Sequence, residues 1–112
     1  MKAIDYREVP LRDVNMEGAK GVKMRWLISQ VEAPNFAMRM FEVEPQGHTP
    51  LHVHPSEHEI FIIEGSGEVT LGDDVKPLGP GVVAYVPPDL RHQFRNTGGT
   101  LLRFLCLIPK EK

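Results

Sequence analysis

Apolar and polar positions alternate along this chain in short stretches. No stretch of eleven or more residues carries an apolar stripe of helical period without a proline or glycine inside it. Ten glycines and ten prolines interrupt the 112 residues, which is typical of an all-β domain. The pattern predicts strands at Val22–Val31, Phe36–Val43, His52–His54, His58–Glu64, Gly67–Leu71, Val82–Val86, His92–Asn96 and Leu101–Ile108.

The breaks between these strands favour a small barrel or jelly roll. We expect breaks at 33–35, 44–47, 72–74 and 77–81, each containing proline, glycine or aspartate. Residues 96–100, Asn-Thr-Gly-Gly-Thr, are predicted to form a hairpin turn between two strands. Many short strands at even spacing indicate an all-β double-sheet jelly-roll barrel.

Two of the predicted strands are apolar on both faces. In His58–Glu64 the alternation places two isoleucines on one side and Phe61 and Ile63 on the other, and Leu101–Ile108 repeats this double pattern. One apolar face can line the interior of a barrel, whereas the other has to be buried against another part of the protein or against a second subunit. A second copy of the chain would bury it, and we therefore predict a homodimer. The alternative is that N-terminal strands of the same chain cover those faces.

Length and charge exclude several classes of protein. Residues 1–112 are expected to form one domain with a single core. A net charge of −2 provides no basic stripe for nucleic acid. The longest apolar run, Ile60 to Ile63, is too short to span a bilayer, and the N-terminal residues lack the apolar stretch of a signal peptide. The single cysteine, Cys106, excludes a disulfide within the chain and fits a reducing compartment. We expect a soluble cytoplasmic protein.

Four histidines, His52, His54, His58 and His92, are the strongest chemical signal in the chain. Three fall within seven residues. Imidazole is the commonest metal ligand among side chains, and the period of two along a strand would point His52 and His54 to the same face. His48 lies in the loop after Pro45, and we expect it to be solvated.

The spacing of these histidines is similar to that of a known family. The two stretches resemble the two cupin motifs, at about 47–65 and 81–96, with 15 residues between them: Gly47-x4-His52-x-His54-x3-His58-x6-Gly65 and Gly81-x5-Pro87-x-Asp89-x2-His92-x3-Asn96. Asp89 replaces a motif glycine, and aspartate tolerates a left-handed backbone better than most residues. The glycine of the first motif is displaced by one position, to Gly47.

His58 stands where a cupin normally has glutamate. The chain therefore resembles the very small manganese cupins that have an all-histidine site. The likeness extends to the segments 33–36, 38–39, 94–96 and 104–110. It implies that the four histidines bind one divalent metal, most readily Mn²⁺, and leave two adjacent positions open. Ligand chemistry alone would favour Fe, Ni, Cu or Zn. Four neutral imidazoles would leave the metal its full +2 charge, which strengthens its Lewis acidity.

Strand parity and the resemblance together predict a pocket. Two candidates for a catalytic role are Arg39, which could hold a carboxylate, enolate or phenolate, and Cys106, which could be an oxidisable thiol. Their alternatives are a surface ion pair of Arg39 with Glu42 or Glu44, and a core position for Cys106. The substrate walls are predicted to be Phe41, Phe94, Phe104 and Ile108.

The resemblance implies a metal-dependent oxidoreductase that cleaves a carbon–carbon double bond of a small molecule, aromatic or otherwise, with dioxygen or peroxide. One alternative is a redox-neutral isomerase or lyase. That reaction needs a group to move a proton, and the sequence offers only Cys106 or Tyr85. The other alternative is a non-catalytic module that binds a metal or a small metabolite.

Overall fold

The computed structural model describes residues 1–110, and these form a double-sheet jelly roll built from strands. The elements are η1 (Tyr6–Glu8, a single 3-10 turn), β1 (Arg12–Asp13), β2 (Lys20–Ile28), β3 (Phe36–His48), β4 (His58–Glu64), β5 (Gly67–Leu71), β6 (Asp74–Leu78), β7 (Val83–Val86), β8 (His92–Asn96) and β9 (Leu102–Pro109). The predicted fold class is confirmed, and β4, β5 and β8 have the predicted bounds.

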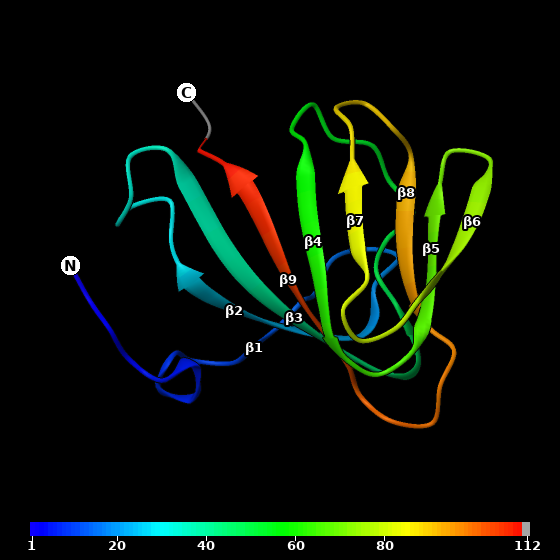
Figure 1. The fold of residues 1–112 in the computed structure, drawn as a ribbon, viewed down its shortest axis with the longest axis horizontal. Coiled ribbons are helices and arrows are strands. Elements are labelled where there is room, and N and C mark those ends of the chain that lie inside the picture. Colours follow the sequence, from blue (N-terminus) through cyan, green and yellow to red (C-terminus); the bar gives the residue numbers. More distant parts are fainter. Residues whose placement is uncertain (111–112) are drawn as a thin grey trace.

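The strands form one curled sheet whose two halves face each other (Figure 1). Its order is β6-β5-β8-β3-β9-β4-β7, and β2 pairs with β3 beside this path. The long strand β3 joins the two halves. Residues 36–43 of β3 pair with β9, whereas His48 at its end pairs with Arg95 of β8. Strands β4 and β8 begin at the same end of the barrel, next to a cavity that is only partly enclosed, and we call this end the open end.

The predicted break at 44–47 is wrong, because β3 continues through it to His48. Opposite β2, the register jumps from Val22↔Val43 to Lys20↔His48, so the extra residues form a β-bulge. Gln46 has a φ of 67° within this bulge. A Cβ at Gly47 would lie 2.6 Å from the carbonyl oxygen of Lys20, so the crossing of the strands requires glycine there.

Three other expectations of the sequence are corrected. The predicted breaks at 72–74 and 77–81 overlap the two ends of β6, which was not predicted; an edge strand tolerates Pro77, and β6 pairs only with β5. Residues 96–100 connect β8 to β9, which do not pair, so they form no hairpin turn. The stretch His52–His54 forms no strand, because only His52 makes a β-bridge, with His92.

Side chains from neighbouring strands meet in rows inside the barrel. At the open end, Arg39 of β3 lies opposite Cys106 of β9, which lies opposite Ile60 of β4. The next row contains Phe41 and Phe104, whose rings stack with centroids 5.3 Å apart. Below it lie Val43 and Leu102, which are completely buried. The interior therefore changes from polar at the mouth to aliphatic at the base.

The N-terminal segment covers part of the outer surface. Arg25 of β2 donates to the backbone carbonyl oxygens of residues 6, 7 and 9. Its guanidinium also lies 5.4 Å from the centroid of the Tyr6 ring. This contact places the segment over the outer face of β2, β3 and β9, where Met40 and Glu42 are buried.

Among residues 1–110, nothing covers the outer face of β4 and β7 in this way. Phe61, Ile63, Val83 and Tyr85 form an exposed apolar surface there, which we call the β4–β7 patch. Phe61 is directly opposite Val83 in the ladder, and their side chains are 46% and 72% exposed. The alternative that N-terminal strands cover the outer faces of β4 and β9 is therefore wrong for β4, whereas the N-terminal segment does lie over β9, where Arg103 contacts the Tyr6 ring. Within the described residues, no helix has the length and apolar character needed to cross a membrane.

Candidate metal centre and cavity

Backbone contacts bring the four motif histidines together at the open end of the barrel. His58 is the first residue of β4, and His92 is the first residue of β8. The amide of His52 donates to the carbonyl of His92 over 3.2 Å, and the amide of His92 donates back over 3.0 Å. The carbonyl of His54 accepts from the amide of Asp89 over 2.7 Å. Asp89 has a φ of 64°, the left-handed conformation expected at this motif position.

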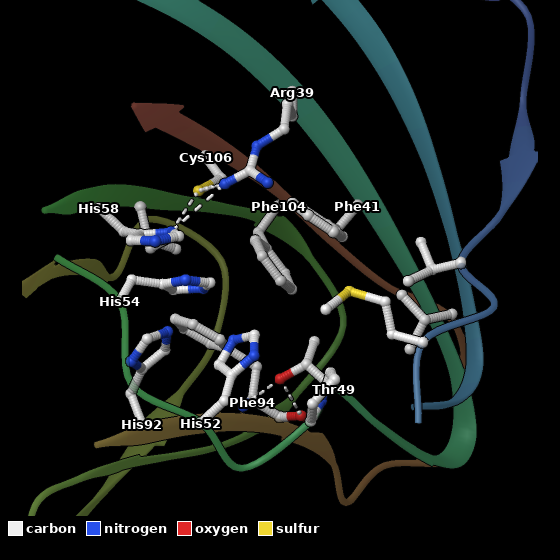
Figure 2. Close-up of a pocket in the computed structure, with 15 residues that line it drawn as sticks. Arg39, Phe41, Thr49, His52, His54, His58, His92, Phe94, Phe104 and Cys106 are labelled. Carbon is white, nitrogen blue, oxygen red and sulfur yellow. Dashed lines mark hydrogen bonds between the residues drawn. The ribbon is translucent and has the colours of Figure 1, made fainter. Parts of the chain in front are cut away.

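The imidazole rings converge (Figure 2). The ligand atoms of His52, His54 and His92 all lie within 4.8 Å of one another, close enough to hold one metal ion. His58 lies beside this trio, with its ring centroid 4.8 Å from that of His54 and 5.1 Å from that of His92. The four side chains therefore surround one small space.

The donor set fits a divalent transition metal. His92 donates Nδ1–H to the carbonyl of Leu90 over 2.9 Å, which leaves the Nε2 lone pair available for a metal. Burial lowers the pKa of His52 to about 4 and that of His58 to about 3, with further lowering by the neighbouring histidines and Arg39. The rings of His52 and His58 are therefore neutral at pH 7, as metal binding requires.

Arg39 and Cys106 contact His58 at the mouth. Arg39 Nη2 donates to Cys106 Sγ over 3.0 Å, and His58 Nδ1 lies 3.3 Å from the same sulfur. A hydrogen bond from His58 Nδ1–H to this sulfur would keep Nε2 available for a metal. Burial raises the pKa of the Cys106 thiol, and Arg39 only partly opposes that effect.

The predicted ion pair of Arg39 with Glu42 or Glu44 does not form. Arg39 and Phe41 point into the barrel, whereas Glu42 lies on the other face of β3 and pairs with Arg103 at 3.2 Å. The Arg39 guanidinium instead lies over the rings of Phe41 and Trp26, 4.9 and 5.6 Å from their centroids.

The histidines line one side of a cavity of about 90 Å³ with largely apolar walls. Its other lining residues are Val14, Met16, Val22, Arg39, Phe41, Thr49, Pro50, Ile60, Phe94, Phe104 and Cys106. No aspartate, glutamate, lysine or tyrosine lines it among the residues described. The cavity therefore offers one cation, four imidazoles, one thiol and an aromatic wall.

Most of the predicted pocket residues line this cavity, but Ile108 does not. It pairs with Ala37, one row beyond Arg39 and Cys106, and lies along a separate groove at the rim. Tyr85 belongs to the exposed β4–β7 patch, so it cannot move a proton in the cavity. The expectation of a solvated loop position for His48 is wrong: it is the last residue of β3, half-buried, with Nδ1 3.2 Å from the carbonyl oxygen of Thr49 and 3.4 Å from Gln93 Nε2. It lies outside the cavity lining.

Two lining residues, Val14 and Met16, had no signal in the sequence. They belong to the segment between β1 and β2, which carries no strand pattern in the sequence. Its position beside the cavity depends on tertiary contacts that the local sequence does not reveal. Thr49 and Pro50, in the loop after β3, were missed for the same reason. Ile60 is different, because it shares a face of β4 with His58 and parity alone could have identified it.

The chain matches a known protein family and is similar in sequence to several known proteins. The family model described as "Cupin domain" matches residues 39–108, more than half of the chain. The oxalate-binding protein of Thermotoga maritima is 37% identical over 105 residues, which cover 88% of this chain and 85% of that protein. The 1-methylthio-D-xylulose 5-phosphate methylsulfurylase of Rhodospirillum rubrum is 35% identical over 67% of this chain. The match spans only 48% of that enzyme's length.

A solved structure agrees over the whole fold. The polyketide cyclase RemF of Streptomyces resistomycificus superimposes with a TM-score of 0.92 and 37% sequence identity. The match covers 99% of this chain and 80% of RemF. These relatives have different named activities, and a shared fold does not determine which reaction a domain catalyses.

Proposed function

This chain belongs to the cupin domain family, and on that basis we propose that it is a metal-dependent oxidoreductase with a four-histidine centre. Its reaction would be the oxidative cleavage of a carbon–carbon double bond in a small, apolar-bodied substrate by dioxygen or peroxide. The observation that carries the proposal is the convergence of His52, His54 and His92 within 4.8 Å at the side of an apolar cavity.

We assign His52, His54, His58 and His92 as the ligands of one divalent ion, manganese by the all-histidine resemblance. His58 is included because its ring completes the group and its Nδ1 has partners of its own. When bound, the ion would supply Lewis-acid and redox chemistry next to the aromatic wall. Neutral imidazoles do not reduce its charge, so an electron-rich or anionic substrate would be attracted.

The remaining side chains of the cavity would bind and orient the substrate. Phe41, Phe94 and Phe104 form a continuous wall, with the rings of Phe94 and Phe104 4.9 Å apart at their centroids. Such a wall favours a flat apolar body and excludes water from the reacting bond. Arg39 and Cys106 lie beside His58 and are the polar side chains nearest to the substrate space at that end.

The redox-neutral alternative has weaker support. An isomerase or lyase needs a side chain that accepts and returns a proton near pH 7. Among the described lining residues that are not proposed ligands, only Cys106 could do so, and its pKa is raised by burial. A reaction in which oxygen or peroxide provides the chemistry does not need such a residue.

A non-catalytic binding module is the second candidate, because one relative is named an oxalate-binding protein. This alternative predicts tight ligand binding without turnover. Mixing the metal-loaded protein with oxalate and measuring both binding and consumption would separate the two functions. Oxalate bound and recovered unchanged, together with inactivity toward alkenes, would favour the binding module.

Product formation with and without oxygen tests the leading proposal. Styrene is a suitable probe, since its cleavage by dioxygen gives benzaldehyde and formaldehyde with all atoms balanced. We expect the manganese-loaded protein to form benzaldehyde in air, to form none under strict anaerobiosis, and to regain activity when peroxide is added. Equal turnover without either oxidant would contradict the proposal. His92→Ala, which removes one ligand, should abolish the product, whereas His48→Ala should not.

We also propose that the protein is a cytoplasmic homodimer that buries the β4–β7 patch. The patch is apolar, contiguous across the paired strands β4 and β7, and left uncovered by the part of the chain that the structure describes. Exposed apolar surfaces of this kind in a small domain favour association with a second copy. The single buried thiol is consistent with a reducing compartment.

A further inference from the structure

The guanidinium of Arg39 has no anionic partner among the residues that the structure describes. Within residues 1–110, the ion pairs join Lys2 to Glu32, Arg7 to Asp5, and Arg103 to Glu42 and Glu64, and none involves Arg39. Its Nε atom is buried and has no hydrogen-bond partner in that part of the chain. The Arg39 side chain is half-buried and no carboxylate of the described residues matches its charge, so an anionic ligand would complete the site.

The position of this cation is fixed by its surroundings. The guanidinium lies over the rings of Phe41 and Trp26, and its Nη2 is held by Cys106 Sγ. In Figure 2 one terminal nitrogen points toward Cys106 and His58, whereas the other lies on the side of Phe104. Because these contacts already order the guanidinium, binding a ligand to it would cost little side-chain conformational entropy.

We propose that the cavity takes a small planar monocarboxylate, with its carboxylate on Arg39 and its apolar body along Phe41, Phe94 and Phe104. This inference rests on the proposed function and specifies its substrate class. A guanidinium matches the planar, two-oxygen geometry of a carboxylate better than the single oxygen of an alcohol or a neutral carbonyl. Apart from the proposed metal ion, Arg39 is the one cationic group in the described lining, and the walls beyond it are largely apolar, so the protein side chains match a ligand with one charged end and an apolar body.

The arrangement also orients the ligand. Arg39 lies in the same row as Cys106 and Ile60 at the mouth, and the aromatic row begins one step deeper with Phe41 and Phe104. A carboxylate held at the mouth therefore directs the rest of the molecule along the aromatic wall.

Binding to the metal-free protein tests this inference without the metal. The probes are benzoate, crotonate and cinnamate, each compared with its primary amide, which has nearly the same shape and no charge. Calorimetry gives the affinities. The single tryptophan, Trp26, reports on occupancy of this site, because the Arg39 guanidinium lies 5.6 Å from its ring. We expect at least one acid to bind tenfold or more tightly than its amide, as a charged hydrogen-bonded pair allows.

Substitutions of Arg39 decide whether this side chain is responsible. Arg39→Met should weaken binding of the acid by about tenfold or more and leave the amide unchanged. Arg39→Lys keeps the charge and should retain part of the preference. Arg95→Met is the matched control, since Arg95 is exposed on β8 and does not line the cavity. The inference is overturned if no acid binds, if acid and amide bind equally, or if Arg39→Met behaves like Arg95→Met.

The two proposals can fail separately. A protein that binds carboxylates through Arg39 but neither binds manganese nor forms benzaldehyde would refute the oxidoreductase and support the Arg39 site. A manganese-loaded protein that cleaves styrene but binds each acid no more tightly than its amide would refute the proposed substrate class alone. Cinnamate links the two, because dioxygen would cleave it to benzaldehyde and glyoxylate with all atoms balanced.

Discussion

Arg39 and Cys106 face each other across the β3–β9 ladder, and the guanidinium donates to the sulfur over 3.0 Å. The same sulfur lies 3.3 Å from His58 Nδ1, so it connects a proposed metal ligand to the unpaired cation of the cavity. A cysteine that is 1% exposed in an apolar strand would by itself be an ordinary core residue. Its two polar contacts make it a positioning residue for both groups.

Cys106→Val and Cys106→Ser test this positioning role. Valine fills the space of the thiol but offers no acceptor, so Arg39 Nη2 loses its hydrogen bond to sulfur and His58 Nδ1 loses its polar contact with sulfur. We expect the free energy of unfolding of the metal-free protein to fall by about 1–3 kcal/mol. Serine keeps an acceptor and should preserve more of the carboxylate preference of Arg39. Urea denaturation and probe binding measure the two effects, and a valine variant equal to wild type in both would rule the role out.

The pKa values of His52 and His58 predict how the stability of the metal-free protein depends on pH. Both lie below the ordinary value of 6.5, at about 4 and about 3. The unfolded chain therefore binds protons first as the pH falls, and stability decreases below about pH 6.5 toward pH 3. The range from pH 6.5 to 5 is the most informative, since most carboxylates remain ionised there.

Urea midpoints of the metal-free protein between pH 7.5 and 5 measure this effect. We expect the midpoint to fall across that range, and we expect His58→Gln to flatten the decrease because it removes one of the titrating rings. A midpoint that stays constant or rises on acidification would show that these imidazoles are not held neutral by the fold.

The central aromatic row predicts a large effect on stability. Phe104 is 1% exposed and its ring lies between those of Phe41 and Phe94, at 5.3 and 4.9 Å between centroids. Phe104→Ala should lower the free energy of unfolding by about 3–5 kcal/mol, because the barrel cannot close around the lost ring. Val75→Ala, on the exposed edge strand β6, should change it by less than about 0.5 kcal/mol. Similar losses in both variants would contradict the layered interior.

The β4–β7 patch predicts an oligomeric state. We expect wild-type protein to sediment as a dimer, and Phe61→Glu to shift it toward the monomer because a charge would be placed in the buried interface. Val75→Glu places the same charge on β6, outside the patch, and should leave the dimer intact. Sedimentation velocity over a range of concentrations distinguishes these cases. A wild-type protein that sediments as a monomer would contradict the proposed homodimer.

Strand parity predicted the inward faces of the barrel because a period of two depends only on local geometry. It placed Phe94 with His92, and Phe104 with Cys106, before any contact was known, and these residues do line the cavity. It failed for Ile108, because parity gives the face of a strand and not how far along the strand the cavity extends. That limit is set by the register of β9 against β3 and β4.

Local signals were misleading where distant partners decide the structure. Pro45 and Gly47 indicate a break, but pairing with β2 carries β3 through them as a bulge. The pair Gly98-Gly99 suggests a hairpin, yet the Asn96 side chain donates to the carbonyls of Val43 and Thr100 and shapes a loop between unpaired strands. The absence of an ion pair at Arg39 could not be predicted, because it depends on Glu42 facing Arg103 on the opposite side of the sheet.

Metal content is the most direct measurement of the central claim. Wild-type protein incubated with MnCl2 and freed of excess ion should retain about one manganese per chain by elemental analysis. Its six-line electron paramagnetic resonance signal should change when cinnamate is added. His52→Ala, His58→Ala and His92→Ala should each lose most of this metal, whereas His48→Ala should retain it. Wild-type protein that retains no metal, or a His92→Ala variant that retains as much as wild type, would contradict the four-histidine centre.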